Sequence, residues 1–263
     1  MANILDPYRP GASVAHRADA RAKLTLAVVA IVATAVLPVG AWPAFVLLFA
    51  AIASLAVLSE LGIGFTARRA LIAVPFALAA LPLIFTTAGA PLGSLRLGGW
   101  TLTATWAGLE RFLSIAVKSW LSVQFAVLLT ATTRFTDMMV AMRALHVPRL
   151  LVVIFGLMWR YLFLLVHEAK GLVTARESRS ADAGMKTGGT LAWRARVTGG
   201  MAGSLFVRGY ERSERVYQAM LARGYDGEVR HFRPAPLSGR QRLALLAGIA
   251  ALAGLTFVGI LFR

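Results

Sequence analysis

Leu243-Ala-Leu-Leu-Ala-Gly-Ile-Ala-Ala-Leu-Ala-Gly-Leu-Thr-Phe-Val-Gly-Ile-Leu-Phe262 is a run of 20 residues without a charged side chain. A helix of this length is about 30 Å long, which matches the hydrocarbon core of a bilayer. Backbone groups left unpaired in lipid are costly, so a run of this kind crosses the membrane as a helix. The run therefore predicts a transmembrane helix and sets the fold class.

Four further apolar runs precede it in the chain. Hydrophobic residues make up 58% of the 263 residues, and each run ends at charged residues, at proline or at a polar loop. We expect an all-α, polytopic membrane protein with about five transmembrane helices. The four earlier runs are Leu24 to Leu37, Pro43 to Leu58, Ala70 to Ala88 and Trp106 to Thr133.

A sixth apolar segment, Leu150 to His167, is ambiguous because Arg160 lies at its middle. On membrane-insertion scales, a cation at the centre of a transmembrane helix costs about 2.5 to 3.5 kcal/mol of insertion free energy. If this segment crossed, the stretch from Lys170 to Arg242, with 14 Lys/Arg against 6 Asp/Glu, would lie outside the cell. Basic loops stay on the cytoplasmic side. We therefore expect the segment to remain cytoplasmic, packed against other helices or entering the interface without spanning.

The same rule orients the whole chain in the cytoplasmic (inner) membrane. Residues 1 to 23 carry four Lys/Arg, and Arg68 and Arg69 mark a second basic loop, whereas the loop at 89 to 105 holds only Arg96. This asymmetry predicts a cytoplasmic N terminus. The expected organisation is an N-terminal membrane domain at 1–133, a cytoplasmic module at 134–242 inserted before the last span, and a C-terminal transmembrane helix at 243–263.

One octet occurs twice in that module, 44 residues apart. The copies are Ala175-Arg-Glu-Ser-Arg179-Ser-Ala-Asp182 and Ala219-Met-Leu-Ala-Arg223-Gly-Tyr-Asp226, and both read Ala-x-x-(Ser/Ala)-Arg-(Ser/Gly)-x-Asp. Small neighbours let a partner surface close around a guanidinium group, so the pattern suggests two copies of one docking device. Coincidence between two basic helix ends is the alternative.

Each octet is expected at the C-terminal end of a helix. The segment from Leu205 to Arg223 is amphipathic, is supported by Glu211 and Arg215 at i, i+4, and meets a C-terminal glycine cap at Gly224. A helix starting near Arg149, after Pro148, should carry the first octet to its end. The alternative role for both arginines is to cap their own helices or lie near lipid head groups.

Several function classes find no support in the residues. The net charge of +16 lies between and beside the spans, so we expect no nucleic-acid partner. The chain has no Cys, its four His residues are scattered, and no Gly-Lys-Ser/Thr phosphate loop occurs. We accordingly expect no metal site, no cofactor and no enzymatic activity.

Tyr210-Glu211-Arg212 followed by Val216-Tyr-Gln-Ala-Met-Leu-Ala222-Arg223-Gly224-Tyr-Asp-Gly227 strongly resembles the signature of the transmembrane T component of energy-coupling factor (ECF) transporters. Supporting resemblances are Arg21-Ala22-Lys23, Val147-Pro148-Arg149, and Arg160-Tyr161-Leu162 with Glu168, so the similarity extends over nearly the whole chain. The sequence around Ala222 is most similar to that of the cobalt-uptake branch, often called CbiQ.

The resemblance implies partners and site residues. In that family the T component joins a substrate-binding membrane subunit to two ABC ATPases, and two Ala-Arg-Gly motifs on coupling helices dock into grooves on the ATPases. The second motif is matched in full, whereas the first departs at both flanks, and Ala175-Arg176-Glu177 is a rival register for it. The docking residues implied are Ser178, Arg179, Ser180, Ala222, Arg223 and Gly224, with Asp182, Asp226, Glu168 and Glu211 in support.

The resemblance leaves the substrate open: cobalt is expected, with nickel or a vitamin as alternatives, and metal ligands would lie on the substrate subunit. A membrane permease that carries its own substrate is the alternative of another class. It would need polar residues facing a midplane cavity. The candidates for that role all lie on the fourth span: Glu110, Arg111, Lys118 and Gln124.

Overall fold

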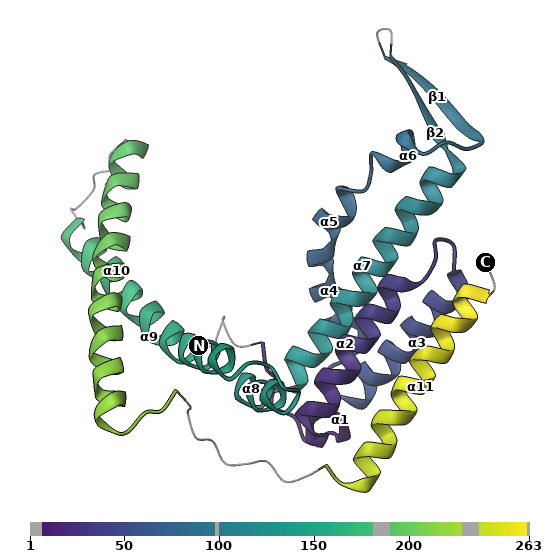
Figure 1. The fold of residues 1–263 in the computed structure, drawn as a ribbon. Helices are drawn as coiled ribbons and strands as arrows, with labels where there is room; N and C mark the ends of the chain where they lie inside the picture. Colours follow the sequence, from purple (N-terminus) through teal and green to yellow (C-terminus); the bar gives the residue numbers. More distant parts are fainter. Residues whose placement is uncertain (1–6, 98–99, 181–189, 228–236, 262–263) are drawn as a thin grey trace. The chain divides into compact units, whose positions relative to one another are not determined.

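The apolar runs form helices in the computed structural model, which describes residues 7–97, 100–180, 190–227 and 237–261. The chain divides into two units. The first comprises Met1–Ala144 together with Pro234–Arg263, and the second comprises Leu145–Arg233. Helices make up most of the described residues, in agreement with the expected all-α membrane class (Figure 1).

The first unit is built around the longest apolar helix of its bundle, α7 (Trp106–Thr132). Helix α2 (Ala20–Val36) packs along α7 and also contacts α11 (Gly239–Leu261), while α3 (Trp42–Leu58) contacts both α7 and α11. Fully buried side chains of α2, α3 and α7 form the core, which includes Leu48, Ile52 and Leu121. Many of the other core positions are alanine, which lets membrane helices approach closely. The alanines are Ala30, Ala41, Ala44, Ala56 and Ala131.

The third apolar run is not the continuous helix that its length predicts. Helix α4 (Ile63–Ala70) is followed by a 3-10 turn (η1, Leu71–Ala73), by α5 (Val74–Leu78) and by α6 (Leu83–Thr86). Backbone bonds between α5 and α6 join residues three apart, as in Leu81 N–H to the Leu78 carbonyl at 3.0 Å. Proline lacks an N–H and clashes with the preceding turn. Pro75 and Pro82 therefore break the run into short pieces, which contact α7.

A β-hairpin follows in a segment that the sequence predicts to be a loop. Strand β1 (Pro91–Leu97) pairs antiparallel with β2 (Trp100–Thr105), with Leu95 opposite Leu102. The second strand alternates Thr with apolar residues, a pattern that favours a pleated conformation. Two short helices complete the unit: α1 (Val14–Arg17) and α8 (Phe135–Ala144).

Three helices in the described residues are long and apolar enough to cross a membrane: α7, α11 and the Arg149–Arg179 part of α9. Helix α3 is also apolar but is shorter, with 17 residues. The last two expected spans are thus matched by α7 and α11. By length and composition α9 also qualifies, and its placement on the cytoplasmic side stays a prediction.

Candidate functional site

The second unit consists of two long helices of equal length, α9 (Arg149–Ser180) and α10 (Leu191–Ala222), with 32 residues each. Helix α9 begins directly after Pro148, whose carbonyl accepts the Leu151 N–H at 3.1 Å, in agreement with the expected start. Helix α10 begins 14 residues earlier than expected, at an N-cap where the Thr190 side chain accepts from the Trp193 N–H. Within this unit the two helices contact each other (Figure 1).

The second motif lies at a fully formed glycine cap. Arg223 is the C-cap of α10, and Gly224 adopts the left-handed conformation with φ of +78°. The Gly224 N–H bonds the Leu221 carbonyl at 2.9 Å, and the Tyr225 N–H bonds the Met220 carbonyl at 3.0 Å. These two bonds define a Schellman motif, which confirms the expected cap. Arg223 is exposed, so the cap presents its guanidinium group to the surroundings of the helix end.

The first motif also lies at a helix end. Arg179 belongs to the last turn of α9 and is exposed, and the Ser178 hydroxyl donates back to the Thr174 carbonyl at 2.8 Å. Ser180 is the last helical residue. Asp182 lies outside the described residues, and Asp226 follows the cap in the second motif.

The rival register of the first motif has a different environment. The Arg176 guanidinium lies over the Trp193 ring, with its central carbon 5.8 Å from the ring centroid. This contact joins the end of α9 to the start of α10. Arg176 therefore has a partner within the unit, on the face of α9 that meets α10.

The supporting glutamates have partners of two kinds. Glu168 on α9 pairs with two arginines of α10: Arg212 at 3.3 Å and Arg208 at 3.8 Å. Glu211 pairs with Arg215 one turn along the same helix, at 3.9 Å, as the i, i+4 spacing predicted. Sequence alone does not identify Arg208 and Arg212 as partners of Glu168, because an ion pair between helices leaves no local pattern.

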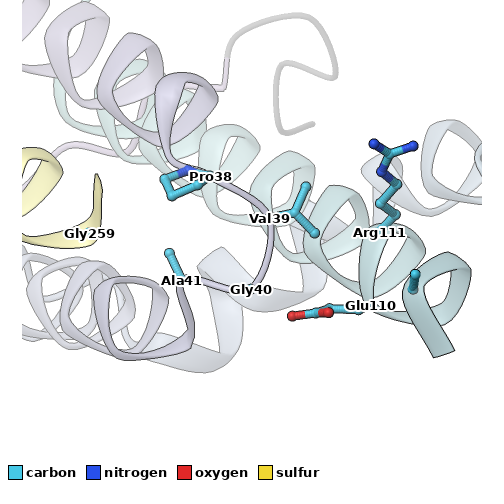
Figure 2. Close-up of a pocket in the computed structure, with 8 residues that line it drawn as sticks. Pro38, Val39, Gly40, Ala41, Glu110, Arg111 and Gly259 are labelled. Carbon is cyan, nitrogen blue, oxygen red and sulfur yellow. The ribbon is translucent and has the colours of Figure 1, made fainter. Parts of the chain in front are cut away.

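The four polar candidates for an autonomous permease do not meet in one cavity. Glu110 and Arg111 line an open cleft of about 380 Å³ in the first unit, and their side chains point in different directions (Figure 2). Lys118 donates to the carbonyls of Ala35, at 3.5 Å, and Leu37, so it caps the end of α2. Gln124 is fully buried, and its amide has no hydrogen-bond partner among the described residues.

The cleft is formed where α2 joins α3 and where α7 and α11 approach that junction. Its other lining residues are small or apolar. Within the described ranges no three His, Asp or Glu residues cluster in a way that could hold a metal ion. The lining residues are Pro38, Val39, Gly40, Ala41, Ala107, Glu110, Arg111 and Gly259.

Comparisons with known proteins agree on one family. The family model described as CbiQ, cobalt transport protein, matches residues 11–232. The chain is 29% identical to the energy-coupling factor transporter transmembrane protein EcfT of Listeria innocua, over 97% of both chains. It is 26% identical to the cobalt transport protein CbiQ of Rhodobacter capsulatus, over 66% of this chain and 69% of that one.

A further relative is an uncharacterized protein, MJ1571, of Methanocaldococcus jannaschii. The two are 33% identical over 49% of this chain, and the chain covers 43% of that protein's length.

Proposed function

Because the chain belongs to the CbiQ family of cobalt transport proteins, we propose that it is the transmembrane coupling subunit of an ECF-type ABC importer. In this role it joins two ABC ATPase subunits to a separate membrane subunit that binds the substrate. The similarity to an EcfT protein over 97% of both chains supports this role. ATP hydrolysis is assigned to the partner ATPases, so the chain itself is not an enzyme.

The capped end of α10 is the observation that carries the proposal. A Schellman motif fixes the direction of the chain directly after Arg223, and the exposed guanidinium is available to a partner. Arginine presents donors in a planar fork, which holds direction as well as charge when it meets carboxylate or carbonyl groups. Arg223 and Arg179 are therefore the two docking residues of the proposal, with Ser178, Ser180, Ala222 and Gly224 as their flanks.

The choice of Arg179 over Arg176 in the first motif is supported by the packing of Arg176. A guanidinium group stacked on Trp193 is already engaged within the unit. Arg179 lies at the same place in its octet as Arg223 and is exposed at the helix end.

The mechanism follows from two rigid helices with a docking residue at each tip. When the ATPases close on ATP, their grooves move, and a helix held at its tip transmits that movement along its length. The membrane helices then tilt or release the substrate subunit. No residue of this chain needs to contact the substrate, and cobalt is the proposed ion, with nickel or a vitamin as alternatives.

The test is co-purification with ABC ATPase subunits. We expect Arg179→Ala and Arg223→Ala each to weaken assembly, because a partner group left unpaired in a desolvated groove costs about 2 to 5 kcal/mol. The double variant should release the ATPases or uncouple hydrolysis from uptake. Lysine at either position should restore assembly only in part, since its ammonium group lacks the planar fork of donors that a guanidinium group has.

Arg194→Ala is the matched control, an exposed arginine of α10 outside both motifs, and should leave assembly unchanged. Full assembly and transport by the double variant would refute the docking role. Loss in Arg176→Ala with none in Arg179→Ala would instead assign the first motif to residues 175–177. Uptake by the chain alone in liposomes would favour the permease.

A further inference from the structure

Where α9 and α10 cross, Glu168 pairs with Arg212 and, at the longer distance of 3.8 Å, with Arg208. Glu168 Oε2 lies 3.3 Å from Arg212 Nη2. One turn before them, a Cβ built on Gly209 would lie 3.6 Å from Leu165 Cδ2, which is ordinary van der Waals contact. We call Leu165, Glu168, Gly209 and Arg212 the crossing.

The residues of the crossing occupy equivalent positions in the repeat. A shift of 44 residues maps Arg179 onto Arg223, and the same shift maps Glu168 onto Arg212 and Leu165 onto Gly209. Contacts between equivalent positions arise where two elements are related by a two-fold axis, as at an isologous interface. The two helices therefore meet at an approximate two-fold axis that passes through the crossing.

We call the part of each helix that runs from its crossing residue to its docking arginine an arm. The two arms have equal length. Arg179 follows Glu168 by 11 residues, and Arg223 follows Arg212 by 11 residues. At 1.5 Å per residue each arm is about 16 Å long. Eleven residues also make about three full turns, so each docking arginine lies on the same side of its helix as its crossing residue.

The ion pair at the crossing is shielded more than other pairs of the unit. The side chains of Glu168 and Arg212 are 21% and 32% exposed, whereas those of Glu211 and Arg215 are 60% and 69% exposed. A less solvated pair is screened less and holds its geometry more strongly.

We propose that Glu168 and Arg212 are positioning residues that act as the fulcrum of the two arms. They hold Arg179 and Arg223 at equal distances from the approximate two-fold axis, so that both arms fit a partner made of two equivalent halves. The inference rests on the proposed function for the identity of that partner. The fixed geometry of the arms is a property of this chain by itself.

Distance measurement tests the geometry without any partner. Ala175 and Ala219 are exposed, equivalent positions one turn before the docking arginines, and the chain has no native Cys. Spin labels on Cys at both positions of the full-length protein should give one narrow distance distribution. We expect Glu168→Gln to broaden it at least twofold. Glu168→Lys combined with Arg212→Glu should restore the narrow distribution once Arg208, which also faces position 168, is changed to Gln.

Glu214→Gln is the matched control, because Glu214 is an exposed glutamate of α10 outside the crossing, and it should leave the distribution unchanged. An unchanged distance distribution in Glu168→Gln would overturn the proposed positioning role of the ion pair.

The assembled transporter supplies the second readout. Glu168→Gln should retain fewer ATPases, because the two docking arginines are no longer held at one separation, and the assembled fraction should transport several-fold less substrate per ATP hydrolysed. The charge-reversed pair should recover that ratio. A ratio unchanged by Glu168→Gln would remove the positioning role even if the distances broadened. Failure of the unmodified protein to retain ATPases would instead refute the proposed function and leave the distance result standing.

Discussion

Gly224 shows how a single residue sets the direction of the docking end of α10. Its φ of +78° is a conformation that costs an L-residue about 1 to 2 kcal/mol, because Cβ approaches the following carbonyl oxygen. Glycine has no Cβ and adopts it freely. The helix can therefore stop directly after Arg223 while the Leu221 and Met220 carbonyls keep hydrogen-bond partners.

We predict that Gly224→Ala loosens this end of the helix. The strain of about 1 kcal/mol corresponds to roughly a fivefold change in the population of the capped state. Retention of the ATPases should fall by a similar factor in a co-purification titration. Gly203→Ala is the control: Gly203 lies inside the same helix with open space around its Cα, and alanine there should be neutral or stabilising. Equal retention by both variants would contradict the role of the cap.

At the scale of elements, α11 and α2 contact each other through glycine. A Cβ at Gly248 would lie 2.7 Å from Leu26 Cδ2, and a Cβ at Gly259 would lie 2.5 Å from Leu37 Cδ2. Membrane helices gain little from burying apolar surface against one another, so their association depends on close packing at small residues. These two glycines, three turns apart, allow the helices to lie close along most of their length.

Gly259→Val is therefore predicted to destabilise the first unit by about 1 to 3 kcal/mol, the usual cost of overpacking. Thermal unfolding of the purified protein in detergent measures this as a lower melting temperature. Gly254→Val serves as the control, because Gly254 lies on the same helix with nothing within 4 Å of its Cβ position. If both variants melted at the same temperature, the close contact with Leu37 would not stabilise the unit.

The elements that could be predicted from sequence are those with local signals. The end of α10 follows from Gly224, and the start of α9 follows from Pro148. The early start of α10 is not predicted by sequence, because glycines at 199, 200 and 203 lower helix propensity, although Thr190 offers an N-cap.

The remaining differences come from tertiary context and from opposing local signals. The hairpin at 91–105 has a weak period-two pattern within a segment that resembles a loop. The break in the third run was signalled by Pro75 and Pro82, but the length of the apolar run pointed to one helix. The contact between Glu168 and Arg212 depends on how two helices cross, which no local sequence pattern encodes.

For the whole molecule, the distribution of basic residues predicts which loops face the cytoplasm. The chain contains no Cys, so a single introduced thiol reports its own position. We expect Cys at Ser238, exposed just before α11, to react with an impermeant thiol reagent in inside-out vesicles but not in right-side-out ones. Cys at Gly93, in the hairpin, should show the opposite pattern. Labelling of position 238 from the outside would mean that α9 crosses the bilayer.

The pairing of α11 with α2 has a consequence for biogenesis. These partners are separated by more than 200 residues, and the entire second unit is synthesised between them. The face of α2 that receives α11 therefore stays uncovered while α9 and α10 leave the ribosome. Contacts between distant segments form late because the loop that they close is long. The membrane bundle is thus completed only after the arms have been made, and an arrest of translation before α11 leaves α2 exposed to lipid and to quality-control proteases.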